Sequence, residues 1–444
     1  MTTTIQGVQN FLERFSEFEN GAGGPSWLRR IRRAAIDRFS ALGYPTTRDE
    51  DWKFTNVAPI AQTTFALADG GAQPSARELA PFHFPELEGT RLVFVNGRYA
   101  EDLSTVRGLP AGVRVGSLAQ ALQEDEELLK QHLAKYVDYE HDAFSALNTA
   151  FITDGGLVHI GRGVVLEEPI HLLYVATRSR TPTVTHPRNL VVAEEGSEAS
   201  VVEEYVSLDA GVYFSNVVTE VVAGDNAVLS HYVIERESTE AYSVGTLRVQ
   251  QGRSSNFTSH TVLLGGALVR NNVHPVLAGE GGECLINGLF MPGDQQHMDN
   301  FMLVEHASPH CDSRQFYNGI LSGRSRGVFS GRIVVHKDAQ KTDAKQTNRN
   351  LLLSDDAQVD SKPQLEIYAD DVKCTHGATI GQLDDDAIFY LRARGISEHL
   401  ARALLLSGFA GENLERMKLE PVRRYIEELV IEKLPEGDLL REIR

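Results

Sequence analysis

A repeat with a step of 28 residues constrains the fold of this chain more than any other feature of the sequence. Small residues recur at this step at one corner of the unit, and strand-forming residues recur along its sides. The columns are Gly196, Gly224, Gly252, Glu280 and Ser308; Ala199, Ala227, Ser255, Glu283 and Cys311; Leu190, Val218, Thr246, His274 and Met302; and Ala193, Val221, Val249 and Leu277. Such a unit is too short for a strand–helix–strand crossover, which needs about 30 residues or more. It suits one coil of a parallel β-helix with two or three short strands per turn.

The repeat and the helical periodicity around it predict a mainly β chain with three parts. We expect an N-terminal helical and mixed region at 1–145, a parallel β-helix core of about seven coils at 146–383, and a C-terminal helical region at 384–444. The helices are expected over 5–18, from Pro25 to about residue 42, over 117–135, from Asp384 to Gly395, over 398–407 and from Pro421 onward. An antiparallel sandwich with evenly spaced turns is the alternative. The β-helix is favoured because several columns share one step.

Composition excludes several classes of function. The formal net charge of −18 repels nucleic acid. Three scattered cysteines favour a reduced, cytoplasmic protein over a disulfide framework. The sequence has no secretory signal at its start and no apolar run that could cross a membrane, so we expect neither export nor a membrane partner. Five arginines of the second helix could form a patch for phosphate or an acidic partner, although a solvated helix face is favoured: Arg29, Arg30, Arg32, Arg33 and Arg38.

Cys374 and His376 are the candidate metal ligands. Side chains alternate along a strand, so these two residues should point to the same face and form half of a tetrahedral metal site. Spacing alone favours a structural role for both, because free cysteine usually packs as a small apolar residue. A second candidate cluster contains His306, His310 and Cys311, but Cys311 falls in the small-residue column and should be an interior corner residue. We expect structural roles for the remaining candidates: Cys284 lies beside that column, and His297 and Asp299 fall in a polar turn that should be exposed.

Several motifs give the chain a resemblance to a known family. They are the segment from Asp371 to Leu383 that contains Cys-Thr-His-Gly-Ala-Thr, the segment from Phe389 to Gly395, and the shorter stretches 51–55, 144–151, 339–344 and 350–353. Together they resemble the SufB/SufD scaffold family of the Suf iron–sulfur cluster assembly machinery, and within it the SufD type. The resemblance covers essentially the whole chain.

The resemblance implies a right-handed parallel β-helix with helical ends and a non-catalytic role as a scaffold. A SufD-like chain would pair with a SufB-like scaffold subunit, and its C-terminal helices would bind a SufC-like ABC-type ATPase. Cys374 and His376 would be its ligands to a transient iron–sulfur cluster at the scaffold interface, beside a cysteine and a glutamate from the partner. No cofactor would be bound stably by this chain alone, and a homodimer in isolation is also implied.

Two other classes of protein remain as alternatives. Many parallel β-helices are carbohydrate-active enzymes that use carboxylates in a surface groove, and Glu203, Glu204, Asp343 and Asp360 are candidate acids here. The repeat does not bring these acids onto one coil. The other alternative is a homomeric structural protein without a metal. Binding of a small ABC-type ATPase would separate the scaffold from both alternatives.

Overall fold

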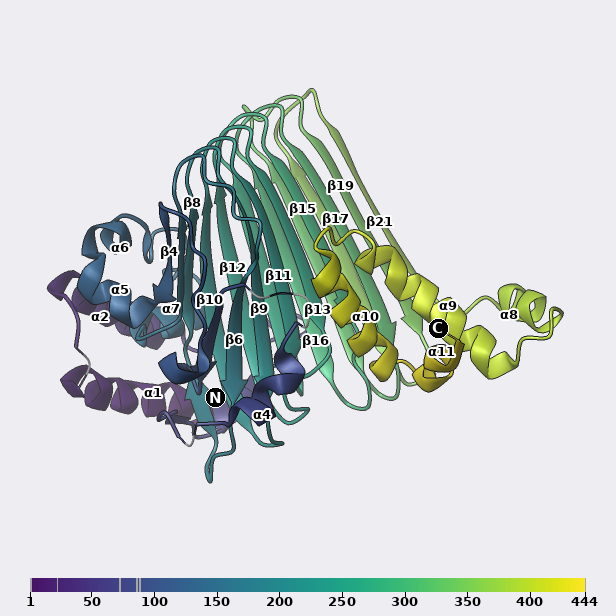
Figure 1. Ribbon diagram of the computed structural model, residues 1–444, viewed down its shortest axis with the longest axis horizontal. Helices are drawn as coiled ribbons and strands as arrows, with labels where there is room; N and C mark the ends of the chain where they lie inside the picture. The colour runs from purple at the N-terminus through teal and green to yellow at the C-terminus, as the bar shows by residue number, and fades with distance from the viewer. Residues whose placement is uncertain (1, 22, 72, 85–86, 88, 444) are drawn as a thin grey trace.

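Two long sheets face each other and form the body of the molecule (Figure 1). The computed structural model describes residues 2–21, 23–71, 73–84, 87 and 89–443. In spatial order the first sheet contains β20 (Gln358–Ile367), β18 (Arg326–Val335), β16 (His297–His306), β14 (Leu268–Leu277), β12 (Tyr242–Gln251), β10 (Tyr213–Ala223), β8 (Arg188–Ala193), β5 (Gly156–Ile160) and β4 (Val113–Ser117), with β7 (Thr183–Thr185) and β1 (Ala66–Leu67) beside this row. The second sheet contains β21 (Lys373–Gly381), β19 (Asp343–Leu352), β17 (Asp312–Leu321), β15 (Glu283–Phe290), β13 (Asn256–Leu263), β11 (Val228–Arg236), β9 (Glu198–Ser207), β6 (Ile170–Ala176), β2 (Arg91–Val95) and β3 (Arg98–Tyr99).

The chain alternates between the sheets, so that each coil contributes one strand to each. From β5 to β21 every ladder between neighbouring coils is parallel. This arrangement confirms the predicted parallel β-helix and excludes the antiparallel sandwich. The solenoid has about eight turns, and most of its strands have eight to eleven residues, which is longer than the short strands that we expected.

The step between coils is not constant. Leu229 pairs with Phe257, which is 28 positions later, but Tyr242 pairs with Leu268 after 26 positions and Arg326 with Gln358 after 32. The predicted column that joined Leu190 to Val218 is therefore wrong, because Leu190 pairs with Glu220. Surface corners absorb insertions while the ladders keep their pairing. The step of 28 residues is kept in the ladders from β10 to β12 and from β11 to β13, and the other steps differ from it by a few residues.

The structural repeat is a backbone conformation at one corner of each coil. Seven residues there have a positive φ: Gly163, Gly196, Asn226, Ser254, Gly281, His310 and Lys341. Each of their N–H groups donates to a carbonyl oxygen of the next coil; for example, Asn226 donates to Arg253 at 2.8 Å and His310 to Gln340 at 2.9 Å. This conformation favours Gly and Asn but here also holds serine, histidine and lysine. Residue type therefore does not reveal the true register.

Most helices of the N-terminal region cover the outer face of the first sheet, whereas α4 (Ala76–Leu79) and η2 (Ala80–Phe82) pack on β2, β6 and β9 of the second sheet. The other helices of the region are α1 (Thr2–Gly21), α2 (Ser26–Leu42), η1 (Glu50–Trp52), α3 (Ala58–Gln62), η3 (Glu101–Leu103), α5 (Leu118–Glu124), α6 (Glu126–His132) and α7 (Ala143–Ala150). Phe39 of α2 and Phe144 of α7 share one buried cluster with Phe214 of β10. The single helix expected over 117–135 is two helices that meet at Asp125, because Ser117 and Asp125 each begin a new helix.

The segment Asp51–Thr55 fastens the N-terminal region to the first sheet. The guanidinium of Arg270 on β14 stacks 4.3 Å from the Trp52 ring and donates to the Asp51 carbonyl at 2.9 Å. The same guanidinium pairs with Asp299 of β16, which also accepts from the Thr55 hydroxyl. The expectation of an exposed turn at His297 and Asp299 is therefore wrong: both residues lie on β16, and Asp299 is fully buried.

One arginine of the predicted solvated cluster is buried. Arg32 donates to the Ile152 carbonyl through Nε at 3.0 Å and to the Gly23 carbonyl at 2.9 Å. Helical periodicity puts Arg32 on the same side as Leu28 and Ala35, which are buried. Arg29, Arg30 and Arg33 are exposed, as expected for a solvated face.

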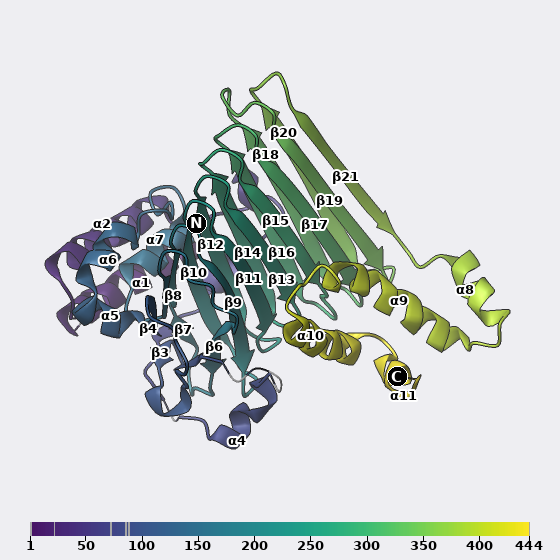
Figure 2. The ribbon, with the colours of Figure 1, turned by 45° about the horizontal axis from the view of Figure 1, so that its top comes forward.

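The C-terminal helices lie beside the second sheet, except for one that extends away from the rod (Figure 2). They are α8 (Asp385–Arg392), α9 (Glu398–Leu414), α10 (Glu420–Lys433) and α11 (Gly437–Ile443). Leu406 and Ile426 join a buried cluster with Ile234 and Leu289 of the sheet, and the amide of Asn413 donates to the Gly288 carbonyl at 2.8 Å. The predicted start of α8 is confirmed, because the Asp384 side chain accepts from the Asp386 N–H.

Candidate functional site

Cys374 and His376 lie on β21, the last strand of the second sheet. Their parallel partners on β19 are Ala344 and Gln346, and both partners are buried. Cys284 occupies the same column as Cys374 three coils earlier and belongs to the core between the sheets. The two candidate ligands therefore occupy columns whose side chains point into the rod. Their neighbours on β19 are buried, but β21 is the last strand of the sheet among the described residues.

The two candidate ligands differ in environment. Cys374 is half-buried and packs against the core between the sheets, and this burial raises the pKa of its thiol. His376 is exposed although its column points into the rod, because the described chain adds no further coil beyond β21 to cover it.

The end of the rod at β20 and β21 is open. Among the described residues, β20 pairs only with β18 and β21 only with β19, so each sheet ends with a free edge. Large apolar side chains gather there: Ile367, Tyr368 and Ile380 are 40%, 64% and 51% exposed. Free edges with exposed apolar residues are typical of a surface that pairs with another chain.

The described part of the chain does not complete a metal site by itself. No group of three or more His, Cys, Asp or Glu side chains within it is placed to hold a metal ion. The donor set of Cys374 and His376, a thiolate and an imidazole, suits zinc or iron–sulfur chemistry. Any such metal would need further ligands from a second chain or from the cargo.

The other sequence candidates are structural. Cys311 is buried and its thiol donates to the Gly279 carbonyl at 3.3 Å, while His306 is buried and its Nε2 lies 2.8 Å from the Ser313 hydroxyl. Burial lowers the pKa of His306 to about 4. His310 occupies the positive-φ corner. These three residues thus have separate packing roles.

Glu203 and Glu204, two candidate acids of the enzyme alternative, do not share a groove. Glu203 is buried between the sheets, where it accepts hydrogen bonds from Tyr205 and Thr219. Glu204 points to the opposite face and is covered by α10, whose Tyr425 hydroxyl donates to it at 2.8 Å. A glycosidase needs two carboxyl groups about 5 to 10 Å apart across an accessible cleft. The arrangement of Glu203 and Glu204 does not meet this requirement.

The exposure of the three thiols leads to a first prediction. Iodoacetamide should modify Cys374 before Cys284 and Cys311, which are buried. The rate should rise from about pH 7 to about pH 9, because the thiolate is the reactive form and burial raises the pKa of Cys374. Mass spectrometry of native protein quenched at intervals measures this order, and Cys374→Ser is the control. Equal labelling of the three cysteines would contradict the burial described.

No helix in the described ranges is long and apolar enough to span a membrane.

Comparisons with known proteins match nearly the whole chain. The family model for the SufBD core domain of the SUF system for iron–sulfur cluster assembly matches residues 174–409, and the model for the SufBD N-terminal region matches residues 8–172. An iron–sulfur cluster assembly SufBD family protein of Synechocystis is 34% identical over 413 residues, which is 91% of either chain. The iron–sulfur cluster assembly protein SufD of Escherichia coli is 33% identical over 404 residues, 90% of this chain and 92% of its own. The SufD protein of Bacillus subtilis is 25% identical over 442 residues, 97% of this chain and 99% of its own. This chain therefore belongs to the SufBD family of iron–sulfur cluster assembly proteins and is of the SufD type.

Proposed function

We propose that this chain is a scaffold subunit that pairs with a SufB-like chain through its open end and shares a transient iron–sulfur cluster with that partner. The observation that carries the proposal is the position of Cys374 and His376 on the last strand, beside two free sheet edges. A pairing partner would cover the exposed apolar side chains of this end and bring its own ligands to the same place.

The cluster is the cargo of this site, and the chain supplies two of its ligands. Ligation requires the thiolate of Cys374 and a neutral nitrogen of His376, so cluster binding releases a proton and weakens at low pH. Because Cys374 is half-buried in the isolated chain, its sulfur would reach the cargo after a small shift of the last coil.

The C-terminal helices would bind the ABC-type ATPase. Phe389 and Tyr390 on α8 are 72% and 57% exposed, and α8 extends away from the rod (Figures 1 and 2). Only residues 382–384 separate β21 from α8. A displacement of α8 by closure of the ATPase would therefore act directly on the strand that carries Cys374 and His376.

A second prediction concerns α8. Changing Phe389 and Tyr390 together to serine should weaken binding of the SufC-like ATPase at least about tenfold, because exposed aromatic residues are common binding hot spots. Affinity is measured by surface plasmon resonance with the chain immobilised. The matched control is Arg402→Ser on α9, which leaves these aromatic residues in place. Unchanged affinity of the double variant would remove α8 from the docking surface.

The whole proposal is tested by co-purification followed by reconstitution. The chain is co-expressed with the SufB-like and SufC-like proteins of the same genome, and the complex is treated anaerobically with iron and sulfide. The expected result is a stable complex whose absorption shows an iron–sulfur chromophore that weakens in Cys374→Ala and His376→Ala. A chain that purifies without both partners, or variants with an unchanged chromophore, would overturn the shared site.

A further inference from the structure

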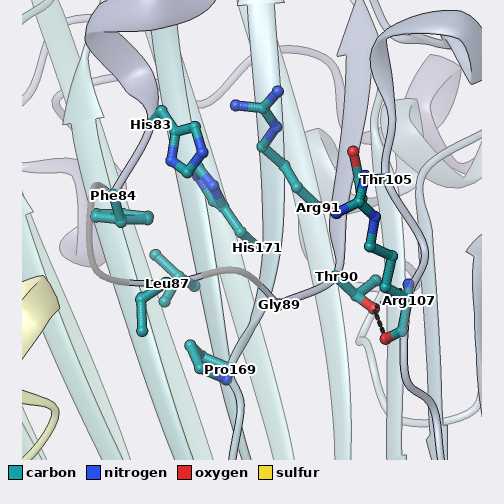
Figure 3. Close-up of a pocket in the computed structure, with 11 residues that line it drawn as sticks. His83, Phe84, Leu87, Gly89, Thr90, Arg91, Thr105, Arg107, Pro169 and His171 are labelled. Atoms are coloured by element: carbon teal, nitrogen blue, oxygen red, sulfur yellow. Dashed lines mark hydrogen bonds between the residues drawn. The ribbon is translucent and has the colours of Figure 1, made fainter.

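A pocket with a volume of about 280 Å³ lies on the outer face of the second sheet (Figure 3). It lies at β2 and β6, toward the end of this sheet opposite β21. Its walls include His83, Phe84, Leu87 and Gly89, the start of β2, Thr105, Arg107 and His171 of β6. The residues of β2 and β6 that reach it, Arg91 and His171, alternate with Leu92 and Leu172, which are buried between the sheets. The pocket is therefore separated from the interior of the rod.

Four side chains that are cationic or can become so face this pocket from four different segments. They are His83, Arg91, Arg107 and His171 (Figure 3). The segment with Arg107 is fixed against β2, because the backbones of Arg91 and Thr105 exchange two hydrogen bonds of 2.7 Å and the Thr90 hydroxyl donates to the Arg107 carbonyl at 3.3 Å. These hydrogen bonds fix the backbone that carries Arg107 beside β2, so the fold brings Arg91 and Arg107 to the same pocket.

Arg91 carries a charge that the described part of the chain does not pair. Its guanidinium is half-buried, and no hydrogen bond or ion pair joins it to another described residue. Burial lowers the pKa of Arg91, and the negative charge of Glu204 opposes this shift only in part. A partly buried cation of this kind needs a counter-ion.

The nearest carboxylates are already engaged or lie at the rim. Glu204 is fully buried and accepts from Arg236 Nε at 3.1 Å and from the Tyr425 hydroxyl at 2.8 Å, with His171 Nε2 at 3.2 Å. Glu168 is exposed and adjoins the pocket near Gly89. Positive charge therefore prevails on the walls that the structure describes.

We propose that this pocket binds a small multivalent oxyanion, held by the guanidinium groups of Arg91 and Arg107. Guanidinium groups bind phosphate and carboxylate groups through paired hydrogen bonds. A volume of 280 Å³ lies just below the usual range for small-molecule pockets and admits an ion between inorganic phosphate and a tricarboxylate in size. This proposal does not depend on the cluster site or on binding of the SufB-like and SufC-like partners.

Isothermal titration calorimetry on the full chain at low salt tests the proposal, with inorganic phosphate in one arm and citrate in the other. We expect saturable one-to-one binding of at least one of these anions. Arg91→Gln should weaken it about tenfold or more, as for the loss of a hydrogen bond to a charged group, and Arg107→Gln should also weaken it. Arg30→Gln, an exposed arginine of α2, is the matched control and should bind like the unchanged chain.

The two arms identify the source of the oxyanion: preference for phosphate indicates a phosphorylated ligand, and preference for citrate a polycarboxylate. The proposal is overturned if neither anion gives saturable binding at about 10 mM, or if Arg91→Gln and Arg107→Gln bind as tightly as the unchanged chain. Arg107 is exposed, so its replacement leaves the fold intact, and thermal melting followed by circular dichroism verifies each variant. Cluster reconstitution with the scaffold partners is unaffected by either result.

Discussion

His376→Ala should abolish cluster delivery in a cell that depends on this pathway. Loss of residues that only orient metal ligands commonly costs about 10- to 100-fold in affinity or activity, so loss of a direct ligand should cost at least as much. The side chain of His376 is exposed at the end of the rod, and its removal should leave the melting temperature unchanged. The activity of a cluster-dependent enzyme in the complemented strain is the measurement.

Thr375→Ala is the matched control for this experiment. Thr375 is adjacent and exposed, but it alternates with Cys374 and His376 along β21 and so belongs to the opposite face of the strand. It should support full activity. A His376→Ala strain with normal cluster-enzyme activity would exclude the ligand role of this residue.

Glu220→Ala should lower the free energy of unfolding by roughly 3 to 5 kcal/mol, because it leaves the buried charge of Arg188 unpaired. Both side chains are fully buried, and Arg188 Nη2 lies 2.6 Å from Glu220 Oε1. The same carboxylate accepts the backbone N–H groups of residues 134–137, including Ala134 at 2.8 Å and Tyr136 at 2.9 Å. Its removal should therefore release this loop from β10 as well.

Urea denaturation followed by circular dichroism measures the stability of the variant, with Glu240→Ala as the control. Glu240 is exposed and its replacement should be nearly neutral. A double variant, Arg188→Met with Glu220→Leu, should recover part of the loss, since apolar residues can replace a buried ion pair. A Glu220→Ala chain as stable as the unchanged one would show that water or another group compensates Arg188.

The architecture could be predicted from the sequence because it depends on a recurring length of chain. The middle coils repeat at close to 28 residues, as in the pairing of Leu229 with Phe257, and this spacing is enough to indicate stacked coils. The register could not be predicted, because the corner conformation is shared by residues as different as Gly196, Ser254 and Lys341. Backbone hydrogen bonds hold that corner, and because they do not involve side chains, several residue types can occupy it.

Strand alternation is a local rule, so the sequence could predict that Cys374 and His376 share one face of a strand, whereas contacts across the fold could not be predicted. Whether the two residues bind a metal stays a prediction. Asp299 resembled an exposed turn residue, and only the approach of Arg270 and Thr55 explains its burial. Arg32 was assigned to a solvated face for the same reason, since its partner Ile152 lies 120 positions away. Charged residues buried by distant partners are not visible in the pattern of their own helix or strand.

The two ends of the rod are unequal, and this limits the size of any polymer it can form. At one end the edge strands β3 and β4 have two and five residues and run antiparallel to their neighbours; at the other, β20 and β21 offer long free edges. When two such chains join edge to edge, each uses its long free edges in the contact, so a third chain meets only short ones. Growth through this contact would therefore stop at two chains and would not give a fibre.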